Sequence, residues 1–434
     1  MNCVRIAAQR LSRTATLLFA ASTVALSHQS LAQTGNDQSA TGGKPAAITE
    51  APKETIRNVI AKPMFAAEKL LAEKKYPEAL AQIAEAEKVD GKTPFELYSL
   101  DRMRAVAALG VGNDALAVKS LESAFASGRV PAAETLNFLD GIARIYYRQK
   151  DFKQAATWAA RAVKEPGARI ETHLMLGHSA YVTNDFATAK TEIAAVVAAA
   201  EQAGTPPPED QLRLLASASH KTSDTAGYVA ALEKLVLRYP KKDYWADLIF
   251  RVESKPGFAE RLVLDVYRLK LITGTLSEKS DFHEMASLAL QSGYPAEAQK
   301  VIDAGDAAGV LAKDAAADSE KKLRASISKE LAEEEKARTA KATTPVVKSS
   351  LALLNNGFDS VLKGDPKKGL DMMETGIKAG DLRRPEDAKL RYGIALVLAG
   401  QKPKASEIFK TVQGTDGSAD LAHLWDLYTR QIGG

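Results

Sequence analysis

Cysteine is almost absent from this sequence. Its only copy among 434 residues is Cys3, which precedes the first apolar stretch of the chain. The lipid-bearing cysteine of a lipoprotein would follow such a stretch, so we do not expect a lipoprotein. Beyond residue 32 there is no cysteine at all. That part of the chain can therefore form no disulfide bond, thiolate zinc site or cysteine nucleophile.

Aromatic residues are also few. They make up 6% of the chain although 45% of it is hydrophobic, and alanine supplies much of the difference. Strands favour β-branched and aromatic residues, and we find no convincing run of alternating strand residues. The composition therefore predicts an all-α protein with closely packed helices.

Long apolar runs are missing as well. The stretch "ATLLFAASTVAL" at 15–26 has twelve residues, fewer than the roughly 20 that cross a bilayer as a helix. It follows three arginines and precedes the small residues "SLA" at 30–32, which is the layout of a secretory signal. We expect a signal peptide over 1–32, cleaved near Ala32, with an uncleaved membrane anchor as the alternative.

Neither sign of charge is in large excess. The formal net charge is +4, but the expected leader holds three arginines and no acid, so the remainder has 58 − 3 = 55 basic and 54 acidic residues. This near-balance gives no argument for a nucleic-acid partner. The next segment, 33–53, is polar and rich in Gly, Ser, Thr and Ala, and we interpret it as a flexible tether.

From about residue 54 onward the chain repeats itself. An aromatic residue followed three places later by alanine recurs, and other copies keep the alanine alone. The pairs are Tyr76 with Ala79, Phe152 with Ala155, Phe186 with Ala189 and Tyr228 with Ala231, and the lone alanines are Ala117, Ala298 and Ala405. The alanines recur at fairly even steps between Ala79 and Ala231, close to the length of a two-helix repeat. We expect helix starts at Pro77, Pro208, Pro295, Pro366 and Pro385, and turns at Gly112, Gly293 and Gly400.

These residues resemble the tetratricopeptide repeat, a short unit that forms two antiparallel helices. The best copy is "LRYGIALVLAGQKPKASEIFKTV" at 390–412. The resemblance implies an α-solenoid in which small residues bring paired helices together and the aromatic fills the space between pairs. On this interpretation Phe152 is a packing residue, and Phe152→Ala costs roughly 3–5 kcal/mol if the ring is buried. Several units longer than the family's, and a poor match over 240–280, depart from the pattern.

The pattern divides the chain into two repeat blocks. We predict an N-terminal solenoid over 54–311, a charged linker over 312–345 and a C-terminal block over 346–434. The linker is rich in Ala, Lys and Glu with few large apolar residues. A solvated helix bridging the two blocks fits this composition best. A disordered linker and a coiled-coil partner site are the alternatives, in that order.

Residues that could carry catalysis form no convincing set. His173 and His178 would diverge by about 140° on a helix of 3.6 residues per turn, so this pair predicts no metal site. "SISK" at 326–329 has the Ser–x–x–Lys spacing of some acyl-transfer enzymes, but it lies in the charged linker. We therefore expect no catalytic residue, no metal and no cofactor, and thus a protein that is not an enzyme.

The first helix of each repeat offers a binding surface instead. Alignment of the copies places one set of polar and aromatic residues on the expected concave face: Asp140, Arg144, Tyr147, Arg148, Glu171, His178, Tyr181, Arg213 and His220. Tyr and Arg are favoured interface anchors. The Lys and Asn set of the family's peptide-carboxylate clamp is not found, so that partner class is not implied.

The sequence therefore predicts an exported, non-enzymatic scaffold of the bacterial cell envelope that binds partner proteins in a concave groove. "YPKKDYWADL" at 239–248 and "SGYPAEAQKVIDAGDAAGVL" at 292–311 are similar to exported repeat proteins that accompany TonB-type systems. We expect a periplasmic location, with membrane contact only through partners or an uncleaved signal. The alternative is an envelope factor that binds glycan or peptidoglycan, although a sugar groove would need more aromatic residues.

Overall fold

The computed structural model describes residues 54–311, 318–340 and 349–431, where every regular element is a helix and no strand occurs. This confirms the all-α prediction. No helix in these ranges is both long and apolar enough to cross a membrane. The expected signal peptide (1–32) and tether (33–53) lie outside the described residues.

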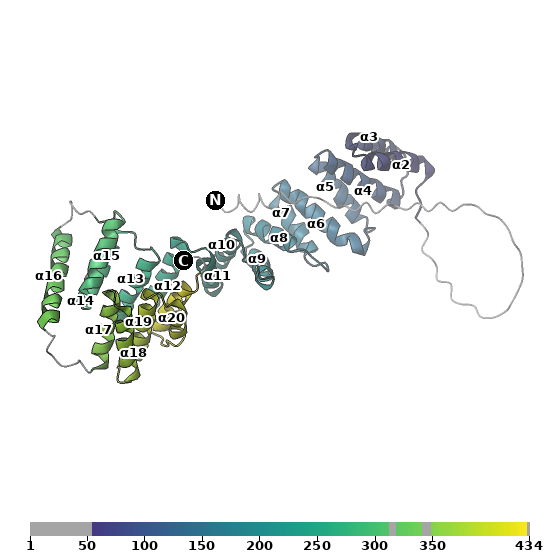
Figure 1. Ribbon diagram of the computed structural model, residues 1–434. Coiled ribbons are helices and arrows are strands. Elements are labelled where there is room, and N and C mark those ends of the chain that lie inside the picture. The colour runs from purple at the N-terminus through teal and green to yellow at the C-terminus, as the bar shows by residue number, and fades with distance from the viewer. Residues whose placement is uncertain (1–53, 312–317, 341–348, 432–434) are drawn as a thin grey trace, which may run out of the picture. The chain divides into compact units, whose positions relative to one another are not determined.

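The chain divides into two compact units at Thr222/Ser223. Unit 1 is built from antiparallel helix pairs followed by a single last helix (Figure 1). Its helices are α2 (Asn58–Ala72), α3 (Tyr76–Glu87), α4 (Pro94–Gly110), α5 (Asp114–Ala126), α6 (Ala132–Arg148), α7 (Phe152–Ala162), α8 (Ile170–Val182), α9 (Phe186–Gln202) and α10 (Glu209–Lys221). We call α2, α4, α6, α8 and α10 the first helices, and α3, α5, α7 and α9 the second helices.

Small residues hold each pair together, as the repeat pattern predicts. The repeat alanines Ala79, Ala117, Ala155 and Ala189 are all 0% exposed. At Gly177 in α8, an added Cβ would lie 2.7 Å from the Ile193 side chain of α9. Helices can approach this closely only where side chains are small, so these positions set the spacing of the pair.

Each hairpin of unit 1 turns through a residue in the left-handed region, which ends the first helix. The φ values are +59° at Lys74, +74° at Gly112, +63° at Lys150 and +65° at Asn184. The expected turn at Gly112 is thus confirmed. Proline starts α3, α15, α18 and α19 as predicted, whereas Pro208 lies one residue earlier, at the N-cap of α10.

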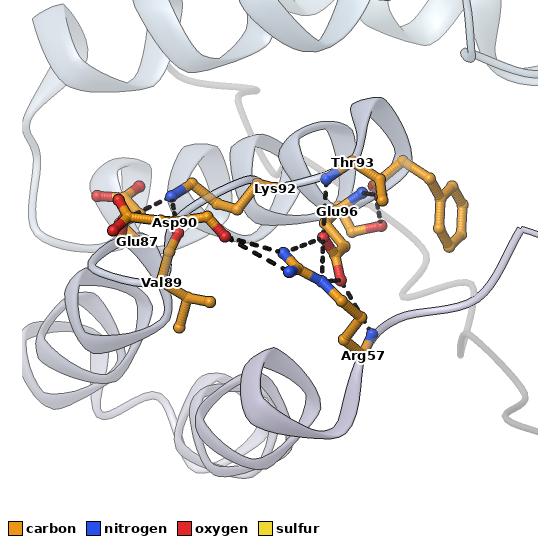
Figure 2. A network of polar contacts seen from close by, with 9 residues as sticks. Arg57, Glu87, Val89, Asp90, Lys92, Thr93 and Glu96 are labelled. Carbon is orange, nitrogen blue, oxygen red and sulfur yellow. Dashed lines mark hydrogen bonds and ion pairs between the residues drawn. The ribbon is translucent and has the colours of Figure 1, made fainter.

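An arginine fastens the first helix of unit 1 to the next first helix (Figure 2). Arg57, the N-cap of α2, donates from its backbone N at 2.9 Å and from its guanidinium Nη2 at 2.9 Å to the carboxylate of Glu96 in α4. Glu96 also closes a capping box with Thr93. The Arg57 hydrogen bonds, helped by backbone N–H donors, lower the pKa of Glu96 to about 2.

Phe152 is less buried than its repeat position suggested. Its ring is partly exposed and makes edge contacts with Tyr147 at 5.5 Å and His178 at 5.6 Å between ring centroids. The earlier condition of full burial is not met, so we expect Phe152→Ala to lower the free energy of unfolding of unit 1 by about 2 kcal/mol. Urea unfolding measures this, with Phe152→Leu as the milder control. An unchanged midpoint would contradict the packing role.

Unit 2 also contains helix pairs, with additional single helices (Figure 1). Its elements are α11 (Thr225–Arg238), α12 (Lys242–Glu253), the 3₁₀ turn η1 (Glu260–Leu262), α13 (Val263–Ile272), α14 (Lys279–Gln291), α15 (Pro295–Ala307), α16 (Asp318–Ala340), α17 (Ser350–Leu362), α18 (Pro366–Lys378), α19 (Pro385–Leu398), α20 (Lys402–Phe409) and α21 (Ser418–Thr429). The stretch over 240–280, which matches the repeat poorly, is nevertheless largely helical.

The end of unit 2 packs against its beginning. Helix α21 contacts α11, α12, α19 and α20. Trp425 of α21 is fully buried and lies near Tyr428, whose ring is 6.5 Å from that of Trp245 in α12. On the outside, the Nζ of Lys255 pairs with Asp420 at 2.7 Å, and Nε2 of His423 lies 2.9 Å from Glu233. Unit 2 is therefore closed on itself and is not an open stack of repeats.

A buried ionic cluster ties the middle of unit 2 together. The guanidinium of Arg268 in α13 donates to Glu297 of α15 at 2.7 and 2.6 Å and to Asp265 at 2.5 Å. It also lies 4.4 Å from the ring centroid of Phe358 in α17. Arg391 of α19 reaches the second oxygen of Asp265 at 3.4 Å. One cluster thus joins helices from before and after α16.

The boundary between the two compact units lies at Thr222/Ser223, whereas the predicted blocks are separated by the linker over 312–345. Residues 223–311 pack with residues 349–431, whereas the sequence pattern grouped them with the first unit. The reason is physical: the Arg268 cluster and the α21 contacts join segments that are far apart in the sequence, and no local periodicity records them. The helix expected within 312–345 is present as α16, which packs on α14 and α15 of this same unit.

Candidate protein-binding face

The nine residues predicted to line the groove differ widely in exposure. Asp140 and His178 are buried, Arg144, Tyr147 and Tyr181 are half-buried, and Arg148, Glu171, Arg213 and His220 are exposed. All nine lie on first helices of unit 1. The structure therefore separates residues that connect the first helices from residues that face solvent.

Asp140 connects α6 to α8. Its Oδ1 accepts a hydrogen bond from Oγ1 of Thr172 at 2.7 Å, and its Oδ2 accepts one from Nε of Arg144 at 2.7 Å. Arg169, the N-cap of α8, approaches the same oxygen at 3.4 Å and donates to Asn137 at 2.6 Å. Both carboxylate oxygens are occupied, so Asp140 stabilises the packing of two repeats and is not free for a ligand.

Tyr147 and Tyr181, one repeat apart, each connect their own first helix to the next first helix. The hydroxyl of Tyr147 lies 3.0 Å from Nδ1 of His178 in the next first helix, and that of Tyr181 lies 2.6 Å from Oγ of Ser217. Each tyrosine ring also packs edge-on against the phenylalanine that opens the following helix, Phe152 or Phe186. Because their hydroxyls are used between helices, these tyrosines offer a partner only their partly exposed rings.

The remaining predicted residues lie on the outside. Arg148 forms an ion pair with Asp114 of α5, with Nε at 3.0 Å from Oδ2. Glu171 and Arg213 are exposed, and neither makes an ion pair with another residue in the described part of the chain. Of the polar residues predicted to bind a partner, Arg213 and Glu171 are thus the most available.

His178 is a buried histidine whose protonation should destabilise unit 1. Burial of its ring lowers its pKa below the ordinary value, so the folded state takes up a proton less readily than the unfolded state. Stability contributed by neutral His178 is therefore present above about pH 6.5 and is lost as the pH falls below it. We expect a lower urea midpoint of unit 1 at about pH 5.5 than at about pH 7.5.

His178→Gln tests this expectation, with His220→Gln, an exposed histidine of α10, as the matched control. The pH dependence should shrink in the first variant and persist in the second. Equal pH dependence in wild type and His178→Gln would show that another group is responsible.

Exposed apolar side chains are concentrated on the first helices. Unit 1 has five large hydrophobic side chains that are strongly exposed within its described residues: Val59 (57%), Phe65 (46%), Leu97 (45%), Val111 (41%) and Ile170 (39%). Four of the five belong to first helices, one lies in a turn, and none lies on a second helix. We call Val59, Phe65, Leu97 and Ile170 the first-helix apolar set. Exposed large apolar side chains on these helices make the first helices the candidate interaction surface of unit 1.

These four residues were not among those predicted from the sequence, because that prediction covered α6, α8 and α10 and named mainly polar residues and tyrosines there. The available signal was the apolar side chain at a position where a solvent-facing first helix would carry a polar one.

The described residues were also compared with the requirements of a metal site. Within the described residues, no group of three or more His, Cys, Asp or Glu side chains is placed so that it could hold a metal ion. His173 is occupied, with its Nδ1 at 2.6 Å from Oε2 of Glu192 in α9. The first helices of unit 1 thus combine packing contacts between repeats with several exposed large apolar side chains.

Comparison with known proteins finds similar solved repeat structures. No family model matches the chain, and no curated protein matches it. The C-terminal part of a TPR repeat-containing protein from Cytophaga hutchinsonii is 14% identical, with 75% of this chain and 98% of that one covered and a TM-score of 0.28. A tetratricopeptide repeat protein from Parabacteroides merdae is 10% identical over 76% and 99% of the two chains, with a TM-score of 0.26.

The type IV pilus biogenesis factor PilW is 16% identical over 57% of this chain and 100% of its own, with a TM-score of 0.24. The helix pairs, the buried repeat alanines and the left-handed turns define the chain as a tetratricopeptide-like helical-repeat protein. Its class rests on these contacts, because TM-scores this low describe only a general likeness.

Proposed function

We propose that this protein is a non-enzymatic scaffold that binds partner proteins through the first helices of unit 1. The first-helix apolar set carries the proposal, since strongly exposed large apolar side chains are confined to one kind of helix and to one turn in the described residues of unit 1. Arg213 and Glu171, on the same kind of helix, supply exposed charges that can give a partner its orientation.

We further propose that the protein works in the bacterial cell envelope after export. The basic residues, short apolar stretch and small residues of 1–32 support this proposal. The resemblance to repeat proteins that accompany TonB-type systems names the partner class to test first. Mass spectrometry of the protein from a periplasmic fraction should give an amino terminus at Gln33, and recovery of intact Met1 from the cytosol would refute export.

A glycan-binding role receives less support. The tryptophans that could line a sugar groove are not available in the described residues, because Trp245 and Trp425 are buried and half-buried Trp158 is stacked by the guanidinium of Arg161 at 4.6 Å.

Affinity capture from envelope extract tests partner binding. We expect Phe65→Asp and Leu97→Asp to reduce recovery of the partner about tenfold or more, because a charge at an apolar anchor must be desolvated on binding. Val111→Asp, an equally drastic change in an exposed turn, is the matched control and should leave recovery unchanged. Equal recovery with all three variants would refute the first-helix surface.

A further inference from the structure

Helix α16 is unlike every other long helix of unit 2 in how it is held. It has 23 residues, yet Ile327 is its only fully buried apolar side chain, flanked by half-buried Leu323 and Leu331 among the residues whose side chains are described. These three side chains share one face at spacings of four residues. The apolar contact of α16 is therefore a narrow stripe.

Ion pairs fix both ends of this stripe. At one end, Glu320 is completely buried and lies 2.8 Å from Nζ of Lys279 in α14, and Arg324 pairs with Asp306 of α15 at 2.7 Å. At the other end, Glu334 accepts from Nζ of Lys363 at 2.7 Å. Glu320 and Glu334 are separated by about four helical turns. Ion pairs at both positions therefore fix how α16 is aligned along α14 and α15.

The contacts also set the direction of α16. Arg324, near the start of α16, pairs with Asp306 in the last turn of α15. Glu334, near the end of α16, pairs with Lys363. The neighbouring carbonyl of Leu362 accepts from Lys300, which lies nearer the start of α15. Helix α16 thus runs antiparallel to α15 along its length. Figure 1 shows α16 beside α14 and α15, outside the hairpin that they form.

The surface of α14 and α15 that α16 covers carries charged groups complementary to those of α16. Lys279 and His283 of α14 both face the buried carboxylate of Glu320, the latter at 3.4 Å. Burial opposes ionisation of Glu320, but Lys279 and Arg324 lower its pKa to about 2, so the carboxylate is charged at neutral pH. The Lys279 and His283 side chains, the carboxylate of Asp306 and a narrow apolar surface together recognise an amphipathic helix.

We propose that this α14–α15 face is a docking site for an amphipathic helix of a partner protein, and that α16 occupies it in the isolated chain. The fitting partner helix carries a carboxylate, then a basic residue four positions later, with aliphatic residues three, seven and eleven positions after the carboxylate. A helix of this pattern competes with α16 because α16 contributes only one fully buried apolar side chain among those described for it. This site lies in unit 2 and is independent of the proposed first-helix surface.

A labelled peptide of residues 318–340 is the probe, because α16 itself defines the pattern. In the full chain, Ile327→Asp places a charge on the docked face and should release α16, whereas Ala325→Asp places the same charge on its exposed face. We expect the peptide to bind Ile327→Asp at least about tenfold more tightly than wild type or Ala325→Asp. A peptide carrying Ile327→Asp should not bind.

Hydrogen exchange reports whether the variants behave as designed. Amides of α16 should lose protection in Ile327→Asp while those of α14, α15 and α17 keep theirs, and Leu331→Asp serves as a second release variant if Ile327→Asp unfolds. Tight peptide binding to a released variant supports the docking site. The proposal is overturned if α16 is released and the peptide does not bind, or if α16 stays protected in both release variants.

Discussion

Replacing Arg268 with methionine is expected to lower the free energy of unfolding of unit 2 by about 3 to 5 kcal/mol. Arg268, Asp265 and Glu297 are each no more than 5% exposed. Removal of the guanidinium leaves two buried carboxylates, one with no partner and one with only the distant contact to Arg391 at 3.4 Å. The cost arises from these uncompensated charges rather than from lost volume, since methionine fills much of the same space.

Urea unfolding followed by tryptophan fluorescence measures this effect in a Trp158→Phe background, where the remaining Trp245 and Trp425 both report on unit 2. Lys378→Met removes an ion pair with Glu374 that is exposed, and should leave the midpoint unchanged.

Adding Asp265→Asn and Glu297→Gln to Arg268→Met should recover part of the loss. A loss that the two amide substitutions do not reduce would show that packing, not charge, is responsible.

Gly369→Ala is expected to destabilise unit 2 by about 3 kcal/mol. Helices α17 and α18 cross so closely that a Cβ at Gly369 would lie 2.4 Å from the backbone oxygen of Gly357 and 2.6 Å from the Val361 side chain. Gly357 and Gly376 are similarly crowded by backbone atoms of the facing helix. Backbone atoms cannot rotate away, so the two helices must separate and lose contacts along their length.

Gly141 in α6 provides the matched control, because nothing lies within 4 Å of a Cβ added there. Gly141→Ala should stabilise unit 1 by about 0.5 to 1 kcal/mol through helix propensity. The same substitution thus has opposite signs at two helical glycines. Thermal unfolding of both variants checks the contrast, and a neutral Gly369→Ala would mean that α17 and α18 can adjust their spacing.

Residues that repeat with the helix pairs were predictable from sequence. The repeat alanines recur at fairly even steps, and a residue kept small in every unit is one against which another helix packs. The same reasoning applies to Tyr147 and Tyr181, whose hydroxyls the structure places between helices. Their separation in the sequence equals that between Phe152 and Phe186, and this repetition is typical of packing residues. The spacing of Asp140 and Arg144 is likewise that of an ion pair within a helix.

The closure of unit 2 could not be predicted in this way. Arg261 pairs with Asp387, and Gln431 donates to the carbonyl of Val236, across 126 and 195 residues respectively. Such contacts have no period, and the charges involved look like ordinary surface charges in the sequence. The packing of α16 on α14 and α15 could not be predicted either, because its narrow apolar stripe resembles that of a solvated helix.

Photo-crosslinking in intact cells tests the central claim most directly. A benzoylphenylalanine placed at Leu97 in α4, and another at Lys119 in α5 of the same hairpin, compare a first helix with a second helix at two exposed positions. We predict a specific cross-linked protein partner from Leu97 and none from Lys119. Cross-links of equal yield from both positions, or from Lys119 alone, would contradict partner binding through the first helices of unit 1.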